Sequence, residues 1–290
     1  MERETPEEIL ARIRQDEDKQ SHGKLKIFFG YAAGVGKTYA MLEAAQTAQA
    51  EGVDVVCGYV EPHQRPATMA LLDGLTCLPV KTGLYHGIEL QELDLDAALA
   101  LKPQLILVDE LAHTNAPFCR NQKRVQDVEE LLRAGIDVYT SVNVQHIESL
   151  NDIVASITGI TVQERIGDDV FDGAEQVELV DIEPDELIAR LRDGKIYARP
   201  TAALASFFVR DNLTALREVA LRRMADRVSR RENSSQVPIE EHILICLSSS
   251  PSNPKVIRTA ARMAAAFGAT FTALFVETPD FPKMSLPDHQ

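Results

Sequence analysis

The sequence has no tryptophan, only four cysteines, few aromatic residues and no long apolar segment. Cys57, Cys77, Cys119 and Cys246 lie far apart without a Cys-x-x-Cys pair, so the spacing supports neither a zinc site nor a disulfide framework. The N-terminus is charged from Glu2 onward, unlike a secretory signal peptide, and no apolar run approaches the roughly 18 residues that a membrane span needs. These absences predict a soluble, cytoplasmic protein with reduced thiols.

Positive charge is scarce as well. The chain has 30 lysines and arginines against 44 aspartates and glutamates, which gives a formal net charge of −14. This acidic balance argues against nucleic acid as a partner. A length of 290 residues with 45% hydrophobic residues fits one large or two medium domains with a buried core.

The glycine-rich stretch Gly30–Thr38 is the strongest local pattern. It follows a short apolar segment, residues 25–29, and precedes a helical pattern over residues 39–45. A strand, a glycine-rich loop and a helix in this order are typical of a phosphate-binding P-loop. We therefore expect a nucleotide phosphate at this point of the fold.

The chemistry expected of this loop follows from its backbone. Glycines allow successive N–H groups to face one phosphate, and the helix that starts there adds the positive end of its dipole. Lys37 would reach the β- and γ-phosphates, and the Thr38 hydroxyl would bind Mg²⁺. The loop departs from the usual P-loop pattern at its first glycine, where this chain has Tyr31, and Gly30 lies one residue earlier. The alternative interpretation is a glycine-rich turn that matches the pattern by chance. The predicted ATP-binding residues of the loop are Gly34, Val35, Gly36, Lys37 and Thr38.

A second pattern places two carboxylates at the end of a predicted buried strand. The apolar residues 105–108 are followed directly by Asp109 and Glu110. In P-loop enzymes the first such carboxylate holds Mg²⁺, and the second is often placed to deprotonate or orient a water molecule. The sequence thus predicts a Mg²⁺ site formed by Thr38 and Asp109, with Glu110 as a candidate catalytic base.

Polar residues also follow the valine-rich strand predicted over residues 53–60. Glu61, His63 and Arg65 come after its carboxyl end, where ligands of open α/β sheets bind. An ordinary polar loop with a helix cap is an equally good interpretation of these three residues.

The strand predicted over residues 137–143 ends in a further polar group. Asn143 or Gln145 would sense the γ-phosphate or position a water molecule, and Asn143 is included among the candidate ATP-binding residues. Helix capping or ordinary hydrogen bonding in the core is the favoured alternative for this group.

Basic residues occur in two places. Arg120, Lys123 and Arg124 follow the second pattern and could stabilise charge near the γ-phosphate, although a solvated loop is the favoured interpretation. The helix predicted over residues 213–228 could dock on an anionic partner, but a basic exposed face packed on an acidic domain is favoured. The arginines on and just after this helix are Arg217, Arg222, Arg223, Arg227, Arg230 and Arg231.

The patterns divide the chain into four parts. These are an N-terminal helix (1–22), a P-loop domain (23–231), a polar linker (232–239) and an incomplete α/β unit (240–290). Besides the strands named above, we expect strands at 78–81, 177–182, 242–247 and 269–276, and helices at 5–19, 94–101, 184–192, 201–209 and 254–267. The fold class is α/β, with helices on both faces of a mostly parallel sheet.

From about Gly23 to the C-terminus, the sequence resembles the N-terminal cytoplasmic region of the KdpD family. These are the sensor histidine kinases of bacterial potassium homeostasis. The resemblance rests on residues 24–38, 108–117 and 135–146. It implies a P-loop NTPase-like domain that binds ATP and adjusts the balance of kinase and phosphatase activity, followed by the start of a universal-stress-protein-like domain.

The same resemblance implies a second ligand. Some family members bind cyclic di-AMP through Ser-x-Ser, twenty residues and then Phe-Thr-Ala-x-Tyr, and this chain has Phe275 in place of the last tyrosine. Hydroxyl and loop N–H groups suit phosphate oxygens, and an aromatic ring can stack on adenine. A serine-rich turn beside an ordinary strand is the alternative. The candidate residues are Ser248, Ser250, Phe271, Thr272, Ala273 and Phe275.

By resemblance, the partners are a histidine-kinase core on the same or a partner chain, a downstream response regulator and a second copy of the chain. The segment 146–150, which begins with His146, faintly resembles a phospho-acceptor sequence, but it lies inside the match and is interpreted as structural or near the nucleotide. A regulatory nucleotide-sensing module is the favoured function. The alternatives are an autonomous P-loop ATPase or small-molecule kinase and a structural domain with an inactive P-loop. In the favoured case Lys37 is expected to be exposed in the empty site.

Overall fold

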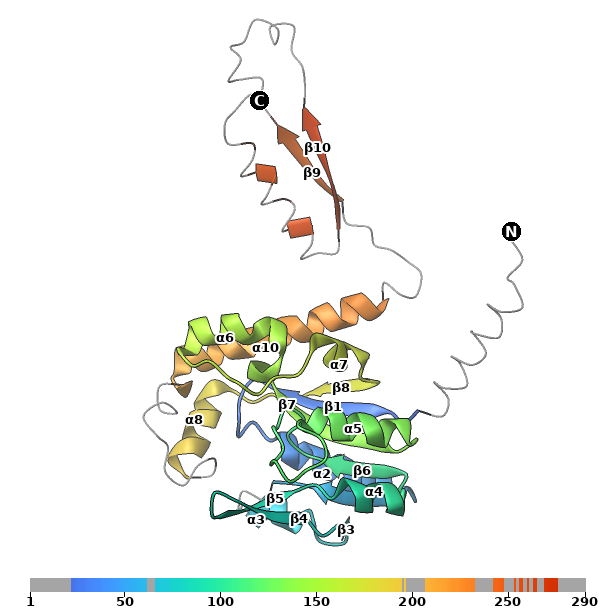
Figure 1. Ribbon diagram of the computed structural model, residues 1–290. Coiled ribbons are helices and arrows are strands. Elements are labelled where there is room, and N and C mark those ends of the chain that lie inside the picture. The colour runs from blue at the N-terminus through green and yellow to red at the C-terminus, as the bar shows by residue number, and fades with distance from the viewer. Residues whose placement is uncertain are drawn as a thin grey trace, which may run out of the picture. The chain divides into compact units, whose positions relative to one another are not determined.

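The predicted P-loop strand and helix are both present (Figure 1). Strand β1 spans Leu25–Gly30, and helix α2 spans Lys37–Ala50. Phe28 packs into the core beneath α2, whereas Ile27 and Phe29 enter the core on the other face of the sheet. Burial on both faces explains why this strand is an uninterrupted apolar run. The computed structural model describes residues 22–61, 66–194, 196, 207–232, 242–247, 253, 256–257, 260, 263–264 and 269–275.

The central element is a six-stranded parallel sheet in the order β3-β2-β6-β7-β1-β8. This confirms the predicted α/β class with a mostly parallel sheet. The remaining strands of the sheet are β2 (Val55–Tyr59), β3 (Thr76–Cys77), β6 (Leu105–Val108), β7 (Asp137–Asn143) and β8 (Gln176–Leu179).

Strand β7 lies between the P-loop strand and the strand that carries the two carboxylates. Gly30 of β1 pairs with Asn143 of β7, and Val108 of β6 pairs with Thr140. Because all three strands are parallel, their carboxyl ends meet at one edge of the sheet. Residues separated by more than a hundred positions are thereby brought together at that edge.

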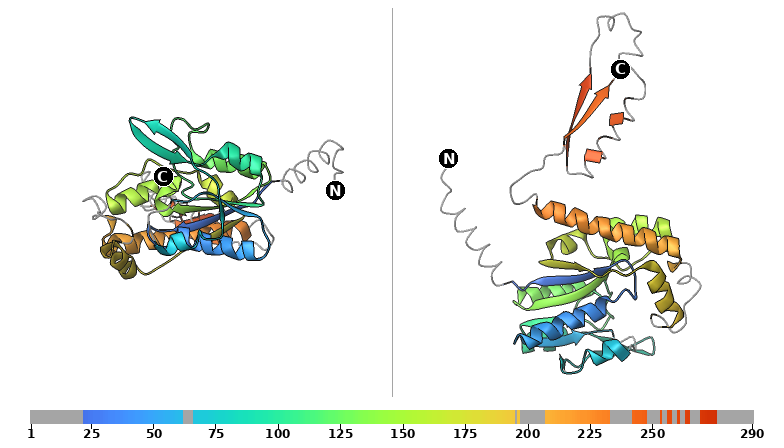
Figure 2. Two further views of the ribbon diagram at one scale, coloured as in Figure 1. Left: turned by 90° about the horizontal axis from the view of Figure 1, so that it is seen from below. Right: turned by 180° about the vertical axis from the view of Figure 1, so that it is seen from behind.

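Helices cover both faces of the sheet. Helix α2 packs on one face, visible from behind in Figure 2, and α4, α5, α6 and α10 contribute to the core on the other. Asp94 caps α4, because its carboxylate accepts a hydrogen bond from the Ala97 N–H at 3.0 Å. The bounds are α3 (Pro66–Ala70), α4 (Leu95–Leu101), α5 (Arg124–Arg133), α6 (Asn151–Thr158), α7 (Asp168–Gly173), α8 (Pro184–Arg192), α10 (Arg210–Glu232), η1 (Val144–His146) and η2 (Glu148–Leu150).

Helix α10 places its basic face on acidic segments of the same unit. Arg217 pairs with Asp181 at 2.6 Å, and Arg223 pairs with Asp172 at 2.8 Å. Arg227 donates hydrogen bonds to backbone carbonyl groups at the end of α7. These contacts confirm that α10 packs its arginines on acidic segments, but the face is only partly exposed as predicted, because Arg223 and Arg227 are buried.

The strand predicted at residues 78–81 is wrong. Instead, β4 (Lys81–Tyr85) and β5 (Ile88–Glu92) form an antiparallel hairpin outside the central sheet. Its two turn residues, His86 and Gly87, both have positive φ angles of 50° and 80°, as a tight two-residue hairpin requires. Most hairpin residues are at least partly exposed, so the segment lacks the buried apolar alternation that would have revealed it.

The chain divides into two compact units, Met1–Arg227 and Val228–Gln290. In the second unit, β9 (His242–Leu247) and β10 (Thr270–Phe275) pair in parallel. The expected N-terminal helix, residues 201–206, the polar linker and most of the helix expected at 254–267 lie outside the described residues. Among the residues that the structure describes, none of the helices combines the length and apolar character needed to span a membrane.

Candidate nucleotide-binding site

The loop between β1 and α2 has the backbone geometry of an anion-binding turn. Gly36 has a φ angle of 115°, in the region that favours glycine, and stands directly before the first residue of α2. At Gly30 a Cβ atom would lie 2.6 Å from Cγ2 of Val35, so only glycine permits this close approach. The loop therefore presents its N–H groups at the start of a helix, as phosphate binding requires.

The departure at Tyr31 is accommodated by the core. The Tyr31 side chain is fully buried, and its hydroxyl donates a hydrogen bond to the Ile182 carbonyl at 3.1 Å. Gly30, one residue before Tyr31, is the glycine that allows the backbone to lie close to Val35 of the loop. The core thus accommodates the Tyr31 side chain below the loop without leaving its hydroxyl unpaired.

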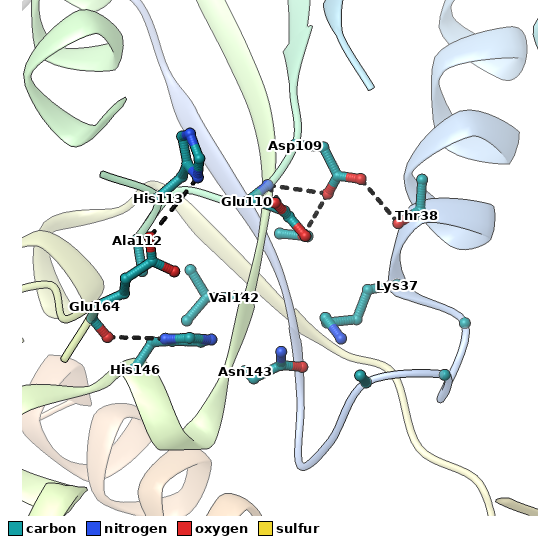
Figure 3. Close-up of a pocket in the computed structure, with 14 residues that line it drawn as sticks. Lys37, Thr38, Asp109, Glu110, Ala112, His113, Val142, Asn143, His146 and Glu164 are labelled. Atoms are coloured by element: carbon teal, nitrogen blue, oxygen red, sulfur yellow. Dashed lines mark hydrogen bonds and ion pairs between the residues drawn. The ribbon is translucent and has the colours of Figure 1, made fainter. Parts of the chain in front are cut away.

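Lys37 is buried rather than exposed, and the prediction of an exposed lysine is wrong. Its side chain is 8% exposed, and its Nζ atom donates to the Ala32 carbonyl at 3.1 Å. The side chain folds back along the glycine-rich loop because a loop carbonyl accepts the ammonium hydrogen bond. Even so, Lys37 lines the same pocket as Thr38 and Asp109 (Figure 3).

Thr38 and Asp109 meet as the sequence predicted. The Thr38 hydroxyl donates to Oδ2 of Asp109 at 2.9 Å, although the two residues come from α2 and the end of β6. Ser141 of β7, which the sequence did not single out, donates its hydroxyl hydrogen bond to the other oxygen, Oδ1. A hydroxyl and a carboxylate are hard oxygen ligands, and Mg²⁺ is commonly held by one or two protein groups together with phosphates and waters.

Among the described residues no group of three or more histidine, cysteine, aspartate or glutamate side chains could hold a metal ion by itself. A hydroxyl and a carboxylate such as those of Thr38 and Asp109 suit a Mg²⁺ ion whose other ligands are phosphate oxygens and waters.

Glu110 adopts an unusual backbone conformation at the mouth of the pocket. Its φ angle is 59°, and its N–H donates to Oδ1 of Asp109 at 3.1 Å. Partial desolvation in the pocket and the adjacent charge of Asp109 raise the pKa of the Glu110 carboxyl group. A carboxylate with a raised pKa is better suited to accept a proton from water near neutral pH.

The end of β7 forms the opposite wall of the pocket. Asn143 lines the pocket, makes no capping hydrogen bond from its side chain, and leaves its Oδ1 atom buried without a hydrogen-bond partner. Buried amide oxygens are rarely left unsatisfied, so a ligand or water at this point would complete it. Gln145, the other candidate, lies 3.5 Å from the His146 ring instead of lining the pocket.

His146 also lines the pocket. Its Nδ1 atom lies 2.8 Å from the Glu164 carbonyl oxygen. Burial lowers the pKa of the His146 imidazole, despite the hydrogen bond to Glu164, and favours the neutral form.

A buried ion network behind the pocket was not predicted. Arg124 is fully buried and donates to Glu92 at 2.7 Å and to the Asp109 carbonyl at 3.0 Å, with its guanidinium over the Tyr59 ring. The other carboxylate oxygen of Glu92 lies 3.0 Å from Nε2 of His113. Burial by itself would raise the pKa of the Glu92 carboxyl group. The hydrogen bonds from His113 and the Ala116 N–H, together with the positive charges of His113 and Arg124, have the larger effect, so the pKa of Glu92 is lowered.

The predicted basic residues do not form a cationic wall. Arg120 pairs on the surface with Asp96 and Glu130, and Lys123 donates to the Arg165 carbonyl. None of the three residues lines the pocket. The exposed Arg120 fits the favoured interpretation of a solvated loop, whereas Arg124 is buried at the start of α5. Arg120 is bound to the carboxylates of Asp96 and Glu130, and Lys123 is bound to the Arg165 carbonyl, so both side chains have partners outside the pocket.

The other candidates fall elsewhere. Glu61 accepts a hydrogen bond from the Tyr59 hydroxyl at 2.8 Å and lines a neighbouring groove. His63 and Arg65 lie outside the described residues, as do Ser248 and Ser250. Phe271, Thr272, Ala273 and Phe275 belong to β10, where Thr272 hydrogen-bonds His242 at 3.0 Å and the Phe275 side chain is 38% exposed.

A family model described as the osmosensitive K⁺ channel His kinase sensor domain, KdpD, matches residues 21–228. The chain belongs to the KdpD family. It is 55% identical over 287 residues to Sensor protein KdpD of Clostridium acetobutylicum, which covers 96% of this chain and 32% of that protein. It is 51% identical over 278 residues to Sensor protein KdpD of Escherichia coli, which covers 92% of this chain and 31% of that protein. The chain thus spans about a third of the length of these two relatives.

Proposed function

We propose that the chain is the ATP-binding regulatory region of a KdpD-type sensor histidine kinase in potassium-responsive two-component signalling. The observation that carries this proposal is the convergence of Lys37, Thr38 and Asp109 at the phosphate-binding loop of a KdpD-family chain. The region would act in the cytoplasm on a histidine-kinase core of the same or a partner chain. A response regulator would receive the signal downstream.

In this proposal the loop N–H groups hold the phosphates of ATP. Lys37 exchanges its contact with the Ala32 carbonyl for one with a phosphate, which offers a stronger, charge-assisted hydrogen bond. Thr38 and Asp109 would hold Mg²⁺, which would neutralise phosphate charge. Asn143, with its unsatisfied amide oxygen, would orient a water molecule at the phosphate end of the pocket.

Binding of a fluorescent ATP analogue in the presence of Mg²⁺ tests the nucleotide site. Loss of the Lys37 charge in Lys37→Ala should weaken binding by about tenfold or more, the scale of a lost hydrogen bond to a charged group. Lys24→Ala is the matched control, because Lys24 is exposed outside the pocket. Equal affinity in both variants would show that ATP does not use this loop.

An autonomous ATPase remains the second candidate, because the carboxyl group of Glu110 has a raised pKa and lines the pocket. Steady-state turnover separates the two functions. A regulatory module should bind ATP and turn it over slowly, whereas an enzyme should show fast turnover that Glu110→Gln abolishes without loss of ATP binding.

Cyclic di-AMP is proposed as a second ligand, bound by the β10 residues together with Ser248 and Ser250. Phe275→Ala should weaken binding by roughly 1–3 kcal/mol if its ring stacks on an adenine base. Calorimetric titration of the purified chain measures this, with Leu244→Ala on the paired strand as an exposed control. An unchanged titration of Phe275→Ala would remove the stacking role.

A further inference from the structure

The proposed nucleotide pocket is poor in fixed positive charge. Its lining includes three carboxylates, from Asp109, Glu110 and Glu164, whereas Lys37 is the single lysine or arginine among the described residues that line it. Arg124 is close, but its guanidinium is bound to Glu92 and to the Asp109 carbonyl. Arg190 of α8 donates to the Gly34 carbonyl of the loop at 3.2 Å and is also bound to Glu186. A bound triphosphate would therefore meet little cationic charge from the described part of the chain beyond Lys37, Arg190 and Mg²⁺.

A second groove adjoins this pocket, and His113 lines both. The groove has a volume of about 620 Å³ and runs between the end of β2, the β4–β5 hairpin and residues 113–117. Its walls carry glutamates and tyrosines and, among the described residues, no lysine or arginine. The lining side chains with charge or aromatic character are Tyr59, Glu61, Tyr85, Glu89, Glu92 and His113.

The groove has the chemistry that binds a guanidinium group. Glu61 and Glu89 form no ion pair with another described residue, and the Tyr59 hydroxyl hydrogen-bonds only one oxygen of Glu61. The Tyr85 ring is exposed enough to stack with a planar cation. Arginine combines a planar fork for carboxylates with stacking on aromatic faces, whereas lysine is a compact, strongly hydrated charge.

One buried carboxylate connects the groove with the nucleotide pocket. Glu92, at the end of β5, binds Arg124 through Oε2 and contacts His113 and the Ala116 N–H through Oε1. Arg124 in turn holds the carbonyl of Asp109. A cation entering the groove would thus lie beside His113, next to the carboxylate end of the pocket.

We propose that this groove binds an arginine side chain of a partner protein, which brings positive charge to the nucleotide pocket. The net charge of −14 favours a basic partner. The proposal rests on ATP binding in the adjoining pocket, because the arginine would be attracted by the phosphate charge.

Fluorescence anisotropy with a labelled oligoarginine peptide tests the groove. The double variant Glu61→Gln/Glu89→Gln should weaken peptide binding by about tenfold or more, as expected when the carboxylates that face a charged partner are neutralised. The matched control is Glu43→Gln/Glu51→Gln, which removes the same two charges from exposed positions at α2. An equal loss in both variants would overturn the proposal, since it would mean that the peptide binds the acidic surface without a specific site.

Two further arms separate the groove from the nucleotide site. A labelled oligolysine peptide should bind more weakly than oligoarginine, and equal affinity would overturn guanidinium recognition. Oligoarginine should bind more tightly when Mg-ATP is present, and no change would overturn the coupling. The groove double variant should keep its affinity for the fluorescent ATP analogue within about twofold, because neither glutamate lines the pocket. Absence of ATP binding in the unaltered chain would instead refute the proposed nucleotide site.

Discussion

The proposed nucleotide pocket and the groove beside it share His113 but are built from different kinds of structure. The pocket is formed at the carboxyl ends of buried parallel strands, and hydrogen bonds fix its polar atoms, as between Thr38, Asp109 and Ser141. The groove has one wall from an exposed hairpin outside the central sheet. Strand ends thus give a rigid site, whereas the hairpin gives a surface with few internal constraints.

The largest effect should come from the buried network that joins the two regions. Arg124→Met leaves Glu92 buried without its guanidinium partner, and breaking such a pair costs about 3–5 kcal/mol of the free energy of unfolding. Urea-induced unfolding measures this loss. Arg120→Met is the control, because its exposed ion pairs should contribute less than about 1 kcal/mol.

A double variant sharpens this result. Arg124→Met/Glu92→Gln removes both charges, so it should recover part of the stability lost in Arg124→Met. If the two substitutions were simply additive, Glu92 and Arg124 would not act as a pair.

A smaller loss is expected from Ser141, which holds the predicted Mg²⁺ ligand in the pocket. Ser141→Ala removes a hydrogen bond to the Asp109 carboxylate and should lower the free energy of unfolding by about 1.5–3 kcal/mol. Ser156→Ala, at an exposed position of α6, should change it by less than about 0.5 kcal/mol. Equal effects of the two alanine substitutions in urea unfolding would contradict a rigid pocket.

Substitution of Glu110 should raise the free energy of unfolding, whereas the preceding substitutions lower it. The folded-state pKa of Glu110 is raised, so its contribution to stability is greatest below the unfolded pKa and declines as the pH rises through the folded pKa. Glu110→Gln cannot ionise and should raise the free energy of unfolding at neutral pH, by less than about 1 kcal/mol because the side chain is partly exposed. Unfolding curves measured from mildly acidic to neutral pH should show the two proteins diverging as the pH rises. If the free energies of unfolding of the two proteins changed in parallel with pH, the pKa of Glu110 would not be raised in the folded state.

The strand ends of the pocket were predictable because each follows an apolar run that only a buried strand requires. Residues 105–110 and 137–143 therefore indicated both the strands and the polar residues after them. The roles of Ser141 and Arg124 were not predicted, since a serine within a strand and an arginine at the start of a helix carry no signal until their distant partners are known. Glu92 lies 32 positions from Arg124 and meets it only through tertiary packing.

The groove was less predictable for a related reason. Hairpin residues alternate apolar and polar only when one face is buried, and here both faces are largely exposed. Lys37 was assigned correctly to the pocket, but its burial against a loop carbonyl depends on the folded loop and not on its neighbours in sequence. Local patterns thus predicted which elements meet, while the conformation of single side chains depended on contacts that no local pattern contains.

The smallest effect should occur at the hairpin tip. Leu84 is 78% exposed, so Leu84→Ser should change the free energy of unfolding by less than about 0.5 kcal/mol. The same substitution at the buried Leu107 of β6 should cost several times more, because it leaves a cavity and buries a hydroxyl group. Urea unfolding of both variants measures the contrast directly. A large loss from Leu84→Ser would mean that the hairpin packs against the rest of the chain, and the groove would then be as constrained as the pocket.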